Sequence, residues 1–438
     1  MTTRREFLRN TALVSAGLAF SGVSAKAAIL PAERNQSPRF SENSPYYFNG
    51  SISREVLENY LNRSVTAGYF LTPGMPERYL FPFRIDDIRM VKNIGTKFIG
   101  RALYRWSEES FLGDPEFLAS AKRLMDYMHE FDPEIIFQAC IFEHVSADVN
   151  NLAIPAWVFR DFDLPVENRN FKSADMVRRL DPNATIRWGE RGGGVPMINN
   201  LETRLWYWFL AKSYIDIGIE AFHLGQVGLI GADDPGLEYF ADFLQKTRHY
   251  AQANARRNYI IMDAHTPTGG MVKDGVSLLD FNSFPLRIKE VLDKPMEGVL
   301  EVGYSDAIYQ RSLPAISPSG WKAENGMPYL VEFDNFGLGT NPGIANWDDH
   351  FTWGYDDITW FAMKNEEDRN KWLWYTFDWI KETDPNGHLQ MPLIRMIYGE
   401  QAEVSFRSYF ANMRSVACPV GYSQEGIIKE IWNTRLKR

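Results

Sequence analysis

Carboxylate and imidazole side chains follow several apolar, strand-like runs of this chain, at the point where each run ends. A pair of carboxyl groups can perform acid–base chemistry, because a protonated carboxylic acid donates a proton while an ionised carboxylate attacks or activates water. A like-charged neighbour raises the pKa of one carboxyl group and so keeps it protonated near neutral pH. The carboxylates in or just after such runs are Glu143, Asp263, Glu301, Glu332 and Asp334.

The elements that must position these groups are short apolar runs, which alternate with amphipathic helical patterns along most of the chain. The strand candidates are residues 68–71, 97–103, 134–142, 219–224, 259–263, 299–303, 328–333 and 391–397. Eight buried strands joined by helices predict an α/β fold, a closed (β/α)8 TIM barrel with long βα-loops, although a doubly wound open sheet would show the same alternation. Segments 264–298 and 304–327 fit less well, and residues 275–284 could form a hairpin or a further strand.

Three helices have start signals in the sequence. Asp114 followed by Pro115 supplies an N-cap and a proline at the first helical position, and Asp234-Pro235 repeats this pattern before a helix to about residue 256. Asn199, with Glu202 three residues later, predicts a capping box for a helix through residue 217. The connection 144–198 is long enough that we expect it to cover the mouth of the barrel.

In a TIM barrel the active site lies at the carboxyl ends of the strands. We therefore expect the strand-end residues to share one cleft with tryptophans of the loops. The predicted catalytic candidates are Glu143, Asp263, Glu301 and Glu332. The predicted substrate-binding residues are Arg101, Tyr104, His144, His223, Gln226, His265, Asp334, Asn335, Trp157 and Trp188.

Glu332 within LVEFDNFG (330–337), in an exported barrel, resembles the large class of barrel-fold glycoside hydrolases. In the best-known retaining clan of that class, a Glu ends strand 7 as the nucleophile and an Asn-Glu pair ends strand 4 with the acid. Glu332 fits the first position, but FHLGQ (222–226) has no Glu for the second. The acid role therefore passes to Glu143 or Asp263, with Glu301 as a further candidate. Retention and inversion of the anomeric configuration both stay open.

No cofactor or metal is expected from the motifs. His223 and His265, with nearby carboxylates, could bind a divalent metal, but the chain has no HxH or HExxH spacing, and neutral hydrogen-bonding histidines are favoured. The glycines at 192–194 lack a following Lys-Ser or Lys-Thr and predict a turn rather than a phosphate loop.

The aromatic residues form two groups. Those at helical spacing, at 206–209 and 372–379, are expected to pack on the outer wall of the barrel. Those in loops or at strand ends could stack on the apolar faces of sugar rings. The loop tryptophans are Trp106, Trp157, Trp188, Trp321, Trp347 and Trp353.

The N-terminal segment predicts export. Thr3-Arg4-Arg5-Glu6-Phe7-Leu8-Arg9 matches the twin-arginine consensus, and an apolar stretch then leads to Ala25-Lys26-Ala27, a small-x-small cleavage pattern. We expect a signal peptide over 1–27, a linker over 28–46, and a single catalytic domain over 47–438. The twin-arginine translocon would be the partner during export, and the mature protein would be periplasmic or secreted.

Composition excludes several other classes of protein. A formal net charge of −9 disfavours a nucleic-acid partner, and 45% hydrophobic residues suffice for a large core. Only Cys140 and Cys418 are present, so no disulfide framework is expected, and no segment after the signal predicts a membrane span. Three functions remain open: a glycoside hydrolase acting on a carbohydrate substrate, a sugar lyase or isomerase on the same barrel, and a non-catalytic glycan-binding protein.

Overall fold

The computed structural model describes residues 41–72, 83–181, 184–185, 193–305, 307–346, 350–398 and 407–436. The chain divides into two units, Met1–Arg39 and Phe40–Arg438, and only the second is described below. The predicted signal peptide and most of the predicted linker lie outside the described residues.

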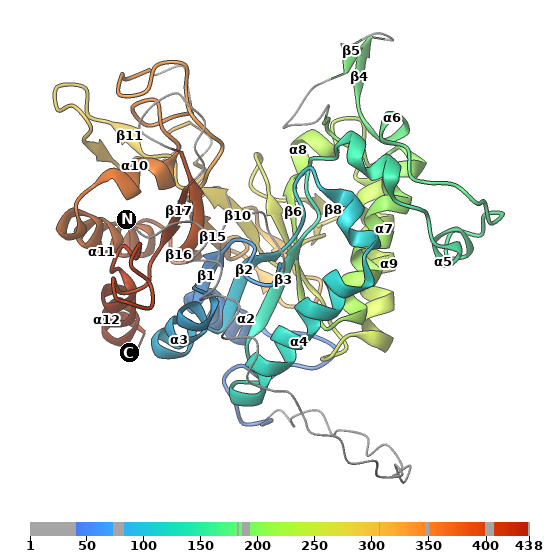
Figure 1. The fold of residues 1–438 in the computed structure, drawn as a ribbon, viewed down its shortest axis with the longest axis horizontal. Coiled ribbons are helices and arrows are strands. Elements are labelled where there is room, and N and C mark those ends of the chain that lie inside the picture. Colours follow the sequence, from blue (N-terminus) through green and yellow to red (C-terminus); the bar gives the residue numbers. More distant parts are fainter. Residues whose placement is uncertain are drawn as a thin grey trace, which may run out of the picture. The chain divides into compact units, whose positions relative to one another are not determined.

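Eight parallel strands form a closed barrel, which confirms the predicted TIM-barrel fold (Figure 1). Each strand is hydrogen-bonded to the next in the order given below, and β16 pairs back with β1 through Val65 and Met391. The barrel strands are β1 (Ser64–Ala67), β2 (Phe98–Leu103), β3 (Ile136–Cys140), β6 (Ala221–Gln226), β7 (Ile261–His265), β10 (Asn282–Pro285), β15 (Tyr329–Glu332) and β16 (Gly387–Ile397). A further strand, β17 (Arg407–Phe410), lies antiparallel to β16.

The predicted strand at 299–303 is wrong, and the alternative within 275–284 is the sixth barrel strand. Val299 belongs to an antiparallel pair of short strands, where it is the partner of Lys289. All four residues of β10 are buried, and Phe284 belongs to the main core. The polar residues of β10 have partners inside the barrel: Asn282 Nδ2 donates to the Gly269 carbonyl at 3.1 Å, and the Ser283 hydroxyl donates to Asp263. A buried polar strand therefore replaces an apolar run that lies at the surface.

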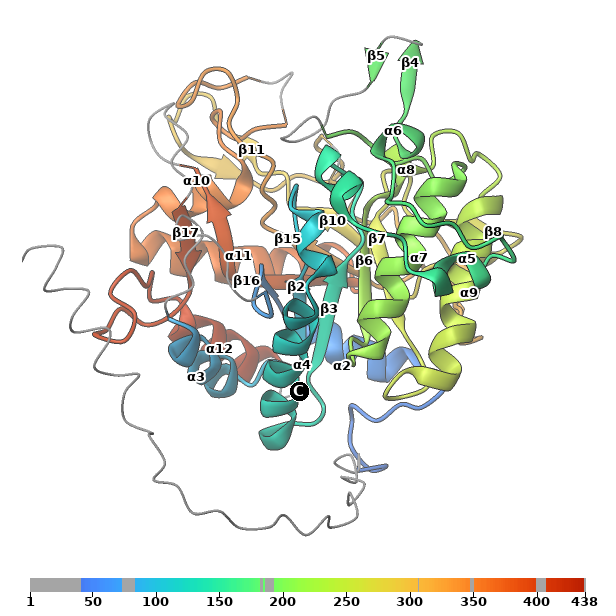
Figure 2. The ribbon, with the colours of Figure 1, turned by 45° about the vertical axis from the view of Figure 1, so that its right-hand side comes forward.

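The main helices surround the barrel (Figure 2). They are α2 (Arg54–Asn62), α3 (Arg84–Ile94), α4 (Pro115–Phe131), α7 (Leu201–Asp216), α9 (Glu238–Asn254), α10 (Asp357–Met363), α11 (Glu366–Thr383) and α12 (Glu425–Arg435). The predicted start of α4 is confirmed, because the Asp114 side chain accepts from the Glu116 amide at 2.9 Å. The aromatic residues of α7 pack outward as predicted, for example Tyr207 against Phe243 of α9 with 5.8 Å between ring centroids.

The other two predicted helix starts are not formed as expected. Glu202 does not close a capping box with Asn199; its carboxylate accepts from Arg169 Nη1 at 2.7 Å and from the Lys172 amide at 2.9 Å. Asp234 does cap a helix, since it accepts from the Glu238 amide at 2.9 Å, but that helix begins at Glu238 rather than directly after Asp234.

Two short helices of the connection 144–198 pack against α7. They are α5 (Ala156–Arg160) and α6 (Ser173–Met176). The shorter elements of the chain are η2 (Glu109–Gly113), η3 (Ala147–Asn151), α8 (Val227–Ile230), β4 (Arg179–Asp181), β5 (Ala184–Thr185), β8 (Val272–Lys273), β9 (Val276–Ser277), β11 (Lys289–Glu290), β12 (Gly298–Val299), β13 (Ala315–Ile316) and β14 (Lys322–Ala323). Residues 182–183 and 186–192 of the connection 144–198 lie outside the described residues, so its covering of the barrel mouth stays a prediction.

Both cysteines are free and buried. In the described ranges, no helix has the length and apolar character needed to cross a membrane.

Candidate active site

Glu332, the last residue of β15, is held by three basic side chains at the carboxyl end of the barrel. Its Oε2 accepts a hydrogen bond from Arg395 Nη1 at 2.6 Å. Its Oε1 accepts from Arg101 Nη2 and lies 3.0 Å from His265 Nε2. The carboxyl group is only 2% exposed. These contacts bring together β2, β7, β15 and β16, which are elements far apart in the sequence.

Arg101 reaches Glu332 because the backbone of β2 is irregular at this position. Arg101 has φ +56°, a left-handed conformation that is uncommon for a non-glycine residue, and the β2–β3 register shifts between Ile99 and Leu103. The Arg101 amide donates to the Gln138 side chain at 3.0 Å instead of to a strand carbonyl. Strain of this kind is found at functional sites, where the surrounding structure imposes it.

The two guanidinium groups keep Glu332 ionised. Burial alone raises the pKa of the Glu332 carboxyl, but the charges of Arg101 and Arg395 and the hydrogen bond of His265 outweigh burial and hold it well below its usual range. Glu332 can therefore serve as a nucleophile or a base, and it is not suited to be the proton donor.

Asp263 lies deeper in the barrel and is fully engaged there. Its Oδ1 accepts from Gln138 Nε2 at 2.6 Å, and its Oδ2 accepts from His223 Nδ1 at 2.8 Å and from the Ser283 hydroxyl. With 1% of its surface exposed, Asp263 has no oxygen facing a substrate. Its predicted role as the acid does not fit this position, and the Asp263–His223 pair fills the barrel interior.

Glu143, just beyond β3, lies beside the end of β6. Its carboxylate accepts from the Gln226 amide at 3.1 Å and from Gln226 Nε2 at 3.3 Å. Gly225 makes this approach possible, because it has φ +64° and a Cβ at this position would lie 1.9 Å from Glu143 Oε2. Gln226 is in turn the register partner of His265 on β7, which contacts Glu332.

Other predicted residues surround these groups. Asp334 lies 3.6 Å from Arg395 Nη2 and 3.9 Å from Arg287 Nη1, and Asn335 accepts a hydrogen bond from Arg395. His144 lies 2.8 Å from the Ser107 hydroxyl and stacks on Trp106 at 4.4 Å between centroids. The structure thus places Asp334 and Asn335 next to Glu332, and His144 on the Glu143 side.

Two predicted site residues lie elsewhere, and one lies outside the described residues. Glu301 is exposed and forms an ion pair with Lys289 of β11, so its predicted place at the end of a barrel strand is wrong. Trp157 stacks on Phe209 of α7 at 6.0 Å, which is helix packing outside the barrel rather than a sugar platform. Trp188 lies in a range that the structure does not describe.

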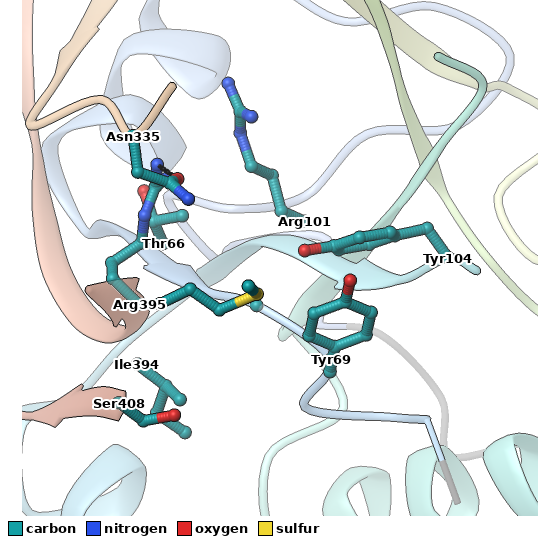
Figure 3. Close-up of a pocket in the computed structure, with 10 residues that line it drawn as sticks. Thr66, Tyr69, Arg101, Tyr104, Asn335, Ile394, Arg395 and Ser408 are labelled. Carbon is teal, nitrogen blue, oxygen red and sulfur yellow. Dashed lines mark hydrogen bonds between the residues drawn. The ribbon is translucent and has the colours of Figure 1, made fainter. Parts of the chain in front are cut away.

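A pocket opens beside the Glu332 cluster and is partly open to solvent (Figure 3). It is lined by Thr66, Gly68, Tyr69, Arg101, Tyr104, Asn335, Ile394, Arg395, Met396 and Ser408. Tyr69 and Tyr104 lie in close contact, with 4.1 Å between their ring centroids. Burial raises the pKa of Tyr104 to about 12, so its hydroxyl is protonated at neutral pH.

Arg395, Arg287 and Tyr69 were not among the predicted site residues. Arg395 interrupts the apolar run 391–397, and a lone arginine within a buried strand is a signal that could have marked it. Arg287 was missed because the sixth strand was misplaced. In the part of the chain that the structure describes, no group of three or more His, Cys, Asp or Glu side chains could hold a metal ion.

Several solved structures are similar to this chain at low identity. A debranching enzyme from Nostoc punctiforme is 13% identical over 90% of this chain and 82% of its own, with a TM-score of 0.44. A GH113 β-1,4-mannanase is 11% identical over 85% of this chain and 99% of its own, with a TM-score of 0.40. A noncanonic maltogenic α-amylase from Thermotoga neapolitana is 15% identical over 51% of this chain, with a TM-score of 0.33, and the match spans only 50% of that amylase.

No model of a protein family matches the sequence, and no curated protein matches it. The barrel assignment rests on the closed strand order, not on these similarities.

Proposed function

We propose that this chain is a glycoside hydrolase in which Glu332 is the ionised carboxylate and Glu143 is the general acid. The observation that carries the proposal is Glu332 itself: a carboxylate at the carboxyl end of a barrel strand, kept ionised by Arg101 and Arg395 next to an open pocket. Enzymes that cleave glycosidic bonds need one such group and one protonated partner. We assign the acid role to Glu143 because Asp263 is enclosed by Gln138, His223 and Ser283, and Glu301 lies at the surface beside Lys289.

In the proposed reaction the acid, Glu143, protonates the glycosidic oxygen as the bond between that oxygen and the anomeric carbon breaks. Glu332 either attacks the anomeric carbon or removes a proton from the water that attacks it. In both cases one water is consumed: its oxygen and one proton form the new hydroxyl on the anomeric carbon. Its other proton returns to Glu143, directly if Glu332 is the nucleophile, and by way of Glu332 and solvent if Glu332 is the base. His265, through its contact with Glu332, and Gln226, through its contact with Glu143, orient the two carboxyl groups.

The test uses the purified full chain on a panel of polysaccharides and aryl glycosides, with product release as the readout. Glu332→Gln is expected to lower kcat by about 10⁴-fold on any substrate. Glu143→Gln is expected to lower it by about 10²–10⁴-fold on natural linkages, and less on aryl glycosides whose leaving group needs little protonation. NMR of the first product anomer distinguishes retention from inversion.

Full activity of Glu332→Gln would remove its catalytic role. Glycan binding without turnover, unchanged when Glu143 and Glu332 are both replaced, would instead identify a non-catalytic binding protein.

A second candidate is a sugar lyase, because the pocket is lined by Arg101 and Tyr104 and by no Asp or Glu. A lyase cleaves the same linkage by elimination: a base removes the C5 proton of a uronate residue, and the bond between C4 and the glycosidic oxygen breaks. That oxygen takes up a proton, no water is consumed, and the product is unsaturated. Ultraviolet absorbance of the products that rises with turnover, together with activity that survives Glu332→Gln, would favour this candidate.

We also propose that the protein reaches the periplasm or the medium through the twin-arginine translocon, on the strength of Arg4 and Arg5 in the consensus run. Arg4→Lys together with Arg5→Lys should leave the precursor in the cytoplasm. Cell fractionation checks this, and unchanged export would contradict it.

A further inference from the structure

The pocket beside Glu332 has an unusual lining for a proposed glycosidase. Its polar side chains are two arginines, two tyrosines, an asparagine, a threonine and a serine, and none of its ten lining residues is Asp or Glu. The carboxylates next to it, Glu332 and Asp334, are both turned to guanidinium groups. The pocket therefore presents mainly hydrogen-bond donors and positive charge.

Both arginines keep donors that are not used within the described residues. Arg101 Nη2 contacts Glu332 and His265, while Arg101 Nε and Nη1 make no hydrogen bond to another described residue. Arg395 donates from Nη1 to Glu332 and from Nη2 to Asn335, and its Nε has no partner among the described residues. None of these atoms is among the enclosed, unsatisfied groups of the described chain, and both arginines line the pocket.

The guanidinium groups are also held in place before any ligand arrives. Arg101 and Arg395 are fixed on different oxygens of the same carboxylate, Oε1 and Oε2 of Glu332. Figure 3 shows Arg101 standing above the paired hydroxyl ends of Tyr69 and Tyr104, with Arg395 and Asn335 on the other side of the view. A fixed guanidinium fork matches the planar geometry of a carboxylate, and the two tyrosines add hydroxyl groups to the same pocket.

We propose that the pocket binds a sugar ring that carries a carboxylate, so that the substrate is a uronic-acid-containing glycan whose carboxylate is bound by Arg101. This inference rests on the proposed function and names its substrate class. A neutral hexose would place a hydroxymethyl group where the free Arg101 donors lie, and would leave part of their hydrogen-bonding capacity unused. The arginines would then have two tasks, to keep Glu332 ionised and to select the anionic ring.

The experiment measures binding to the full wild-type chain by calorimetry. The ligands are galacturonate and glucuronate, the methyl ester of each, and the neutral sugars galactose and glucose. At least one uronate is expected to bind about 10- to 100-fold more tightly than its methyl ester and its neutral counterpart, as one charge-assisted interaction provides. The preference should shrink at high salt. The ester has the same ring without the charge, so no variant is needed for this arm.

A variant arm identifies the arginine. Arg101→Gln should reduce the ratio of uronate to ester affinity to near one, whereas the surface variant Lys289→Gln should leave that ratio unchanged. Equal binding of the uronate and its ester by the wild type would overturn the inference. Tighter binding of galactose 6-sulfate than of either uronate would overturn the assignment of the anion as a carboxylate.

The two proposals fail in different ways. Turnover of neutral glycans with no preference for uronates would leave the hydrolase standing and remove the uronate inference. Charge-dependent uronate binding without turnover of any uronate glycan would remove the hydrolase and leave the anionic pocket.

Discussion

Two buried glutamates at opposite ends of the barrel are each held between two arginines. Glu332 ends β15, while Glu220 directly precedes β6 and so lies at the amino end of the parallel strands. Glu220 accepts from Arg256 Nε at 3.1 Å and lies 3.1 Å from Arg257 Nε. Burial raises the pKa of Glu220, but the charges of Arg256, Arg257 and His129 outweigh it, so the pKa lies below its usual value, as at Glu332.

The two clusters differ in what else their arginines contact. Arg257 is 2% exposed, and its Nη2 donates to the Pro133 carbonyl at 3.1 Å and to the Glu134 carbonyl at 3.2 Å, while its Nη1 donates to the Tyr60 hydroxyl. Arg101 and Arg395 line an open pocket and keep free donors. The exposure of the arginines does not separate the clusters, since the Arg256 side chain is 15% exposed and that of Arg101 14%. A lowered pKa does not by itself mark a functional site; what distinguishes Glu332 is the pocket that Arg101 and Arg395 line.

The largest effect that tests this comparison is on stability. Glu220→Gln leaves two arginines buried without a counter-charge and should lower the free energy of unfolding by about 3–5 kcal/mol. Glu332→Gln should cost less, because water in the pocket can solvate Arg101 and Arg395. Urea unfolding of both variants, followed by circular dichroism, measures the difference. An equal or larger loss for Glu332→Gln would mean that the carboxyl-end cluster is structural as well.

Much of the fold could be predicted from the sequence. Six of the eight predicted strands overlap a barrel strand, because strands buried on both faces form continuous apolar runs. The predicted strand 68–71 is wrong, since these residues form a turn directly after β1. The sixth barrel strand was misplaced since β10 contains Asn282 and Ser283, whose polar side chains find partners only inside the closed barrel. By its apolar side chains alone, the run 299–303 resembles a buried strand more than β10 does. Only the tertiary pairing of the strands shows which of the two belongs to the barrel.

The candidate site was predicted only in part, for a related reason. Glu332, Arg101 and His265 were expected at strand ends and do contact one another. Their catalytic and binding roles stay predictions. What the sequence did not show is how far into the barrel each side chain reaches: Asp263 and His265 are two residues apart on one strand, yet only His265 reaches Glu332.

A smaller effect concerns the pH dependence of activity. In the wild type the ionised, active form of Glu332 persists to low pH, because Arg101 and Arg395 lower its pKa. Arg395→Gln removes one of these charges, so the pKa of Glu332 should rise and kcat/KM should begin to fall at a higher pH as the solution is acidified. The ratio of kcat/KM at neutral to acidic pH should increase by about tenfold or more, since one pKa unit corresponds to about 1.4 kcal/mol.

Arg256→Gln is the matched control, since it removes a comparable charge from the Glu220 cluster. It should destabilise the protein without moving the acid limb of the pH–rate profile. A profile that moves equally in both variants would show that the acid limb reports unfolding rather than ionisation of Glu332.

The smallest effect is expected at Glu301, which the sequence indicates as a further candidate for the acid after Glu143 and Asp263. Its only partner in the described residues is Lys289 at the surface, and pairs of this kind contribute little because water and salt screen them. Glu301→Gln should change the free energy of unfolding by about 0.5 kcal/mol or less, and kcat/KM by less than about twofold. Urea unfolding measures the change in stability. Steady-state kinetics, run in parallel on Glu143→Gln, measure the change in kcat/KM. Glu301 would then be a third case, a surface carboxylate paired with one lysine. Glu220 and Glu332 are both buried between arginines, and the arginines of Glu332 line a pocket. Only a buried carboxylate next to a pocket, as at Glu332, is expected to serve catalysis. A large loss of activity in Glu301→Gln would show that an exposed carboxylate can serve it as well.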